Sequence, residues 1–287
     1  MRNSEWIQAG FAAVLAIVAW IRPVEASRRK AITVFAVVAI AVVALARLSV
    51  SVLGQGASSI LRDWLPVPLT LIPYWQTGQF FKGPDEKIQA WLVESDRVIL
   101  GFFARSGFRF GPIARLTMEW AYALCYGLAF FGLIVLYAAG LRREADGYWT
   151  LVLIPTYLCY AVTPFFPALP PRTLHAEPAR SKTTKSRVFN LWLLKYGSIQ
   201  AISFPSAHAA CAMAISLVLL HDLPIAGAIF LVISLWISVA AVVGGYHYAI
   251  DVILGAALAL VFYFAWQTHL IPSTLMTAPA MAFVTPL

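Results

Sequence analysis

The sequence has few charged residues, since Asp, Glu, Lys and Arg make up 12% of its 287 residues while 61% are hydrophobic. A soluble domain is nearer half apolar and a quarter charged, and a chain of this length cannot bury so much apolar surface in water. The high hydrophobicity also excludes a disordered chain. The apolar runs lack the period-2 alternation of membrane β-strands. The composition therefore predicts an all-α protein that crosses the membrane several times.

Cysteine and acidic residues are also scarce. The three cysteines, Cys125, Cys159 and Cys211, lie inside apolar runs, which argues against a disulfide framework and a CxxC metal site. The 13 acidic residues are outnumbered by 21 basic ones, giving a net charge of +8. In a membrane protein this excess is typical of loops that set topology and contact anionic lipid, so we expect no nucleic-acid partner.

Seven apolar runs are long enough to predict spanning helices. These runs are 6–21, 31–53, 116–139, 148–168, 203–220, 224–243 and 247–269. Cleavage of the first run as a signal peptide is the alternative, because Val24-Glu25-Ala26 loosely resembles a cleavage site. We expect N-terminal helices over 1–57, a catalytic bundle over 58–270 and a tail over 271–287.

The segment before the third run is harder to interpret. Residues 60–81 are apolar but contain three prolines, so they either span or dip into the membrane and return. Residues 85–104 mix charged and apolar side chains, which is typical of an amphipathic helix on the membrane surface.

Basic loops predict the orientation in the membrane. If 58–110 does not cross, the loop with Arg28, Arg29 and Lys30 and the loop with Arg142 and Arg143 both lie in the cytoplasm. The start of the 203–220 run is then on the extracytoplasmic face. The basic loop 172–198 counts against this topology, and a crossing at 60–81 would change it.

Two polar segments interrupt the apolar runs. Ser203–Ala209 opens one helix, where Ser203 suits an N-cap, and Gly244–Asp251 opens the last helix. One helical hairpin separates the segments, so both reach the same face of the membrane. His247 and Asp251 stand one helical turn apart, which lets the carboxylate orient the imidazole and leave its other nitrogen as a nucleophile.

Together with His208, which is placed to protonate a leaving group, this arrangement suits phosphoryl transfer through a phosphohistidine. Helix N-termini nearby offer backbone N–H groups to an anion. A zinc site built from His208, His247 and Asp251 is the competing hypothesis, although no HExxH spacing supports it.

Pro205-Ser206-Ala207-His208 resembles the PSGH motif of the type 2 phosphatidic acid phosphatase superfamily, and His247–Asp251 resembles its HxxxD motif. The resemblance implies a six-helix bundle core and metal-free catalysis without a cofactor. It also implies that His247 attacks phosphorus, Asp251 orients it and His208 protonates the leaving oxygen.

Departures from the family pattern indicate a subgroup. The Ser-Arg pair that commonly precedes the HxxxD histidine is replaced by Ala240-Ala241, and the glycine of PSGH is Ala207. FPSxHA with HYxxD is similar to inositol phosphorylceramide synthases, which move a phospho-headgroup to a lipid alcohol instead of to water. The resemblance therefore implies a membrane lipid phosphatase or phosphotransferase.

The expected substrate is a membrane phospholipid or an isoprenoid lipid phosphate, with a lipid alcohol as a possible acceptor. Because Ala241 replaces the usual arginine, Arg172 is the first candidate for binding phosphate, and Lys182 is a weaker one. Ser206, Tyr246 and Glu119 are the other substrate-binding candidates, and a Glu119–Arg172 ion pair is the alternative for Glu119. A non-catalytic lipid-binding or transport protein remains open as a different class.

Overall fold

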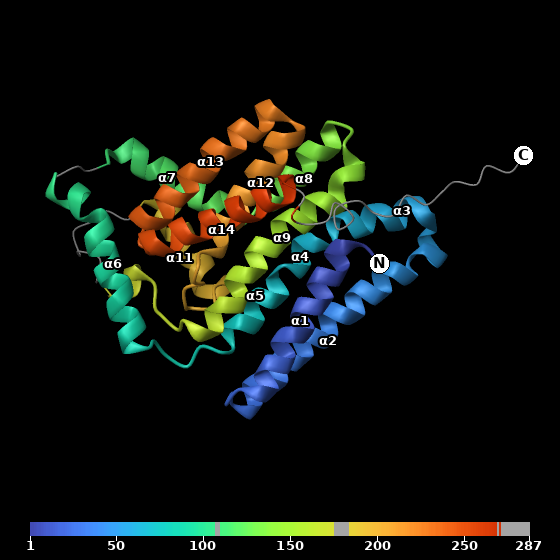
Figure 1. Ribbon diagram of the computed structural model, residues 1–287, viewed down its shortest axis with the longest axis horizontal. Helices are drawn as coiled ribbons and strands as arrows, with labels where there is room; N and C mark the ends of the chain where they lie inside the picture. Colours follow the sequence, from blue (N-terminus) through green and yellow to red (C-terminus); the bar gives the residue numbers. More distant parts are fainter. Residues whose placement is uncertain (107–109, 175–183, 269, 271–287) are drawn as a thin grey trace, which may run out of the picture.

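The computed structural model describes residues 1–106, 110–174, 184–268 and 270, and within these ranges every regular element is a helix. The described helices are α1 Asn3–Ile21, α2 Ala26–Leu48, α3 Val50–Trp64, α4 Pro66–Leu69, α5 Leu71–Gly78, α6 Glu86–Arg105, α7 Pro112–Leu124, α8 Leu128–Ala138, α9 Ala145–Val162, α10 Pro171–Leu174, α11 Lys185–Gly197, α12 Ala207–Asp222, α13 Pro224–Val243 and α14 Ala249–Gln267. The prediction of an all-α membrane protein is confirmed (Figure 1).

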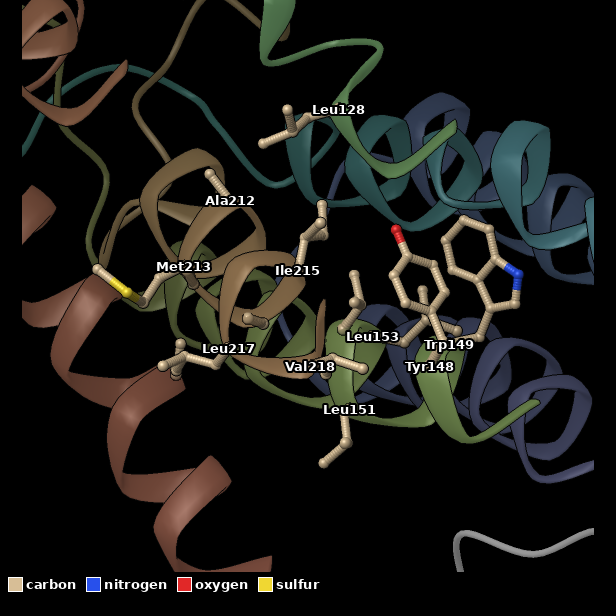
Figure 2. Close-up of a cluster of buried hydrophobic side chains, with 14 of the residues drawn as sticks. Leu128, Tyr148, Trp149, Leu151, Leu153, Ala212, Met213, Ile215, Leu217 and Val218 are labelled. Atoms are coloured by element: carbon tan, nitrogen blue, oxygen red, sulfur yellow. The ribbon is translucent and has the colours of Figure 1, made fainter. Parts of the chain in front are cut away.

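The bundle is built around α9 and α12, which pack against each other at its centre. Both helices are buried along most of their length, and the largest hydrophobic cluster is formed mainly by their side chains and those of α8. Figure 2 shows Tyr148 and Leu153 of α9 lying against Ile215 of α12. Helices α13 and α14 pack against α12 and carry apolar side chains on their outer surfaces.

Among the described residues, four helices are long and apolar enough to cross a membrane, namely α1, α2, α13 and α14. The pair α7 and α8 passes the same test together but is bent by 75°. The expectation of one helix over 116–139 is therefore wrong, because the chain breaks between Leu124 and Leu128. Helices α9 and α12 are shorter than their predicted runs. Both lie at the centre of the bundle, where other helices surround them. The protein is thus integral to the membrane and multi-pass.

The chain over residues 60–81 travels from one end of the bundle to the other. Asp63, at the end of α3, binds Arg2 and Arg142 near the N-terminus of α1. Gln76 of α5 donates to carbonyl oxygens of α1 and α2, and the carbonyl of Phe81 accepts from Arg28 after the α1–α2 turn. The prolines divide this passage into the short helices α4 and α5.

This passage corrects the predicted topology. Arg22 donates to Pro164 O after α9, at 3.4 Å, so the α1–α2 turn lies at the end of the bundle where α9 ends. The loop with Arg142 and Arg143 precedes α9 and lies at the opposite end. The two basic loops therefore lie at opposite ends of the bundle, which does not fit the topology expected if 58–110 does not cross and fits the alternative in which 60–81 crosses.

Helix α6 lies across the end of the bundle where α9 ends and where α12 and α14 begin (Figure 1, left). Its Leu92 is completely buried in a cluster with Ala168, Ile202, Phe204 and Tyr248. Its exposed residues include the charged Glu94 and Arg97 together with Val93 and Val98, as expected for an amphipathic helix at a membrane surface.

Candidate active site

The two motif-bearing segments meet where α12 and α14 begin. The amide of Ser206 donates to Asp251 O at 2.9 Å, which joins the start of α12 to the first turn of α14. This close approach requires Gly255, because a Cβ there would lie 2.3 Å from Ser206 O. The hairpin of α12 and α13 returns the chain to this end, as the sequence predicts.

His208, His247 and Asp251 form one continuous hydrogen-bonded chain. Nδ1 of His247 lies 3.1 Å from Oδ2 of Asp251, and Nε2 of His247 lies 3.2 Å from Nδ1 of His208. Asp251 is completely buried and His247 is 4% exposed. The structure thus brings together the three residues for which the sequence predicts catalysis.

The direction of the hydrogen bonds follows from the carboxylate at one end of this chain. An ionised carboxylate only accepts, so Nδ1 of His247 carries a proton and its Nε2 is left with a lone pair. Nδ1 of His208 is then the donor in the contact between the two imidazoles. The arrangement holds a nucleophilic nitrogen next to a proton donor.

The start of α12 uses both serines of its motif for local hydrogen bonds. The hydroxyl of Ser206 accepts from Ala209 N at 3.3 Å and caps the helix, whereas the hydroxyl of Ser203 accepts from Ala207 N at 3.2 Å. The prediction of Ser203 as the N-cap is therefore wrong by three residues. The buried Ser206 hydroxyl orients the helix that carries His208.

Arg172 lies beside the turn that precedes His247. Its amide donates to Gly245 O at 2.9 Å, and its guanidinium carbon lies 5.8 Å from the ring centre of Tyr246. Gly245 has a φ of +66°, a conformation that favours glycine. Burial lowers the pKa of Arg172, and the guanidinium remains charged at neutral pH because its ordinary pKa is so high.

Tyr246 is almost completely buried and is held by contacts of both its ring and its hydroxyl. It stacks on Tyr122 with 3.7 Å between ring centres, and its hydroxyl donates to Oε2 of Glu119 at 2.6 Å. Glu119 also accepts from Asn190 at 2.6 Å and forms an ion pair with Arg187 at 3.3 Å. Among the described residues, the partner of Glu119 is thus Arg187, and the alternative pairing with Arg172 is not formed.

Residues outside the two motif-bearing segments also lie near the histidines. The ring of Tyr126 lies edge-on to His208, with 5.5 Å between ring centres, and α6 contributes Gln89 and Asp96 to the segments around the site. Only the fold brings these distant residues together. Lys182 lies outside the described residues.

No group of three or more His, Cys, Asp or Glu side chains within the described ranges is arranged to hold a metal ion. The site instead combines two imidazoles, one buried carboxylate and a nearby guanidinium. This combination can supply a nucleophile, a proton donor and a phosphate-binding cation.

The comparisons with known proteins agree with the superfamily that the motifs suggest. A family model described as PAP2 superfamily matches residues 91–265, which include all three residues of the hydrogen-bonded chain. No curated protein and no solved structure matches the chain. Because the matched region covers more than half of the sequence, the chain belongs to the PAP2 superfamily.

Proposed function

We propose that this protein is an integral membrane lipid phosphatase or phosphotransferase that works through a phosphohistidine on His247. The observation that carries the proposal is the chain from Asp251 through His247 to His208, with contacts of 3.1 and 3.2 Å. Membership of the PAP2 superfamily supports a phosphatase-type enzyme acting on lipid phosphates.

In the first half of the reaction, Nε2 of His247 attacks the phosphorus atom and the bond to the lipid oxygen breaks. Asp251 accepts the hydrogen bond from Nδ1 and stabilises the positive charge that develops on the imidazole. Protonated His208 transfers its proton to the leaving oxygen. The negative charge of the incoming phosphate favours this protonated form of His208.

In the second half, neutral His208 takes a proton from water or from a lipid alcohol. The resulting oxygen nucleophile attacks the phosphohistidine and releases His247. The imidazole contact of 3.2 Å leaves no space for phosphate between the two rings. An attacking atom sits about 3–3.5 Å from its target before reaction, so we expect the His208 ring to turn aside as substrate binds.

Arg172 is the proposed phosphate-binding residue. Its amide is fixed to Gly245, two residues before His247, and no carboxylate pairs with its side chain among the described residues. A guanidinium can bind two phosphate oxygens at once. Ser206 and Tyr246 contribute indirectly, because their hydroxyls bind Ala209 N and Glu119.

Transfer to a lipid alcohol, as in the inositol phosphorylceramide synthases, is the proposed alternative to hydrolysis. Its support is the Phe204–Ala209 and His247–Asp251 pattern together with Ala241 in place of arginine. The two reactions share the first half, so the acceptor distinguishes them. Phospholipids and isoprenoid lipid phosphates are both candidate donors.

We also propose that the catalytic end faces the extracytoplasmic side. The short basic loop with Arg142 and Arg143 lies at the other end, where the positive-inside rule favours the cytoplasm. Arg28, Arg29 and Lys30 lie at the catalytic end and favour the opposite orientation by the same rule, so a labelling experiment decides between the two. Cysteines introduced at exposed Ser27 and Arg143 test this in intact cells. An impermeant maleimide should label Ser27→Cys, and labelling of Arg143→Cys instead would reverse the orientation.

Turnover of a panel of lipid phosphates and phosphodiesters tests the activity, using purified protein in detergent and chelator with or without a diacylglycerol or ceramide acceptor. Free phosphate released by the wild type and not by His247→Ala would identify a phosphatase. A new phospholipid formed only with acceptor would identify a transferase. If a folded wild type turns over none of these substrates, the catalytic proposal fails and a non-catalytic role gains support.

A further inference from the structure

Helix α6 contacts all three segments that form the catalytic end of the bundle. Leu92 packs with Ala168, Phe204 and Tyr248, one residue from each segment. Trp91 lies edge-on to Phe204, with 5.8 Å between ring centres. One surface helix therefore connects the segment before Arg172, the segment before His208 and the residue after His247.

The strongest of these contacts involves Asp96. Its Oδ1 accepts a hydrogen bond from the amide of Ala249 at 2.6 Å. Ala249 is the first residue of α14, and the N-cap residue Tyr248 provides no side-chain cap. The first amides of a helix have no partner within the helix, so Asp96 caps α14 from a different helix.

This cap acts where the catalytic groups are attached. Ala249 is two residues from both His247 and Asp251, whose side chains are joined at 3.1 Å. A hydrogen bond from N–H to a carboxylate is stronger and shorter than a neutral one, which agrees with the 2.6 Å separation. Fixing the first turn of α14 thus fixes the angle at which His247 presents its nitrogen.

Gln89, two turns earlier on α6, holds a different segment. Its amide group accepts from Leu169 N at 2.8 Å and donates to the hydroxyl of Tyr248 at 2.5 Å. That hydroxyl also donates to Leu169 O at 3.1 Å. Leu169 precedes Arg172 by three residues, so Gln89 ties the proposed phosphate-binding residue to the start of α14.

From these contacts we infer that Asp96 and Gln89 are positioning residues for the reaction, Asp96 acting on His247 and Gln89 on Arg172. The inference rests on the proposed function and goes beyond it, because it makes the surface helix part of the catalytic machinery. It also predicts that the two residues affect different kinetic constants. Loss of Asp96 should lower kcat, since the nucleophile is misaligned, whereas loss of Gln89 should raise KM.

Variants of Asp96 and Gln89 test these separate effects on kcat and KM, with steady-state kinetics on the lipid phosphate that the wild type turns over. We expect Asp96→Ala to lower kcat about tenfold with little change in KM. Asp96→Asn should recover most of the rate, because its side-chain oxygen still accepts from Ala249. Gln89→Ala should raise KM about tenfold. Glu94→Ala is the matched control, since Glu94 is exposed and pairs only with Arg97 on the same helix.

Hydrogen exchange of the folded variants gives a second measurement that does not depend on turnover. We expect faster exchange at residues 246–252 in Asp96→Ala than in Glu94→Ala, with α9 unchanged. Faster exchange with wild-type kcat would overturn the positioning role, and so would unchanged exchange in Asp96→Ala. If the wild type has no activity, the proposed function fails while the exchange result still decides whether Asp96 holds α14.

Discussion

Gly255 is the position at which one added methyl group should damage the site most directly. In the substitution Gly255→Ala, the new Cβ would lie 2.3 Å from Ser206 O and 3.1 Å from Ser206 C. Carbon and oxygen atoms approach no closer than about 3.3 Å without strain, so the helices must separate by about 1 Å. Both obstructing atoms belong to the backbone, and no side-chain rotation can relieve the contact.

The expected cost has two parts. Overpacking of this kind destabilises a protein by about 1–3 kcal/mol, which should lower the midpoint of thermal unfolding. The separation also pulls Ser206 away from Asp251, a contact of 2.9 Å, and moves His208 relative to His247. A displacement of about 1 Å in a catalytic geometry can reduce turnover about 100-fold.

Kinetics and thermal unfolding in the same detergent measure both effects. Gly10→Ala is the matched control, because Gly10 also lies within a helix but a Cβ there would meet nothing within 4 Å. We expect Gly10→Ala to keep wild-type turnover. Wild-type kcat in Gly255→Ala would refute the argument that the contact of α12 with α14 sets the histidine geometry.

Four further predictions follow from the contacts of individual side chains. Asp251→Asn should lower kcat by about 1,000-fold or more without changing lipid binding, because the orienting carboxylate is lost; wild-type kcat would contradict this role. Arg172→Lys should raise KM about tenfold, since an ammonium cannot bind phosphate through two parallel hydrogen bonds, and an unchanged KM would remove Arg172 from the site. Glu119→Gln should destabilise the protein by about 1–3 kcal/mol in thermal unfolding because Arg187 loses its buried partner, and an unchanged midpoint would show that the ion pair is not needed. Burial raises the pKa of Asp96 to about 6, so this carboxyl is protonated more readily in the folded protein and its contribution to stability falls as pH rises from about 4 to 6. The unfolding midpoint of Asp96→Asn minus that of the wild type should therefore be larger at pH 7 than at pH 4.5. The same difference at both pH values would contradict the raised pKa.

The main features of the site were predictable from local patterns. The i, i+4 spacing of His247 and Asp251 predicted their contact, which is present although α14 begins at Ala249 and His247 lies just before the helix. The length of the 203–243 region predicts a hairpin that returns the chain, and with it His247, to the end where His208 lies. Apolar runs of the required length predict the membrane helices regardless of how they pack.

Two features of this protein depend on contacts between distant segments, and only the tertiary structure decided them. These features are the path of residues 60–81 and the partner of Glu119. The prolines in 60–81 are compatible with either a crossing or a return, and only the contacts of Asp63, Gln76 and Phe81 show that the chain runs from one end of the bundle to the other. The partner of Glu119 could be either arginine, and the packing of α11 against α7 selects Arg187.

Helix α6 shows most clearly that local sequence patterns do not predict contacts between distant segments. Its sequence predicts an amphipathic surface helix, because periodicity reports only which side of a helix is buried. Whether Asp96 faces solvent or the amide of Ala249 depends on where the helix docks, and this docking is set by Leu92 packing against residues more than seventy positions away. Local spacing thus determined which residues are proposed to be catalytic in this protein, while the long-range packing of its helices determined what holds them in position.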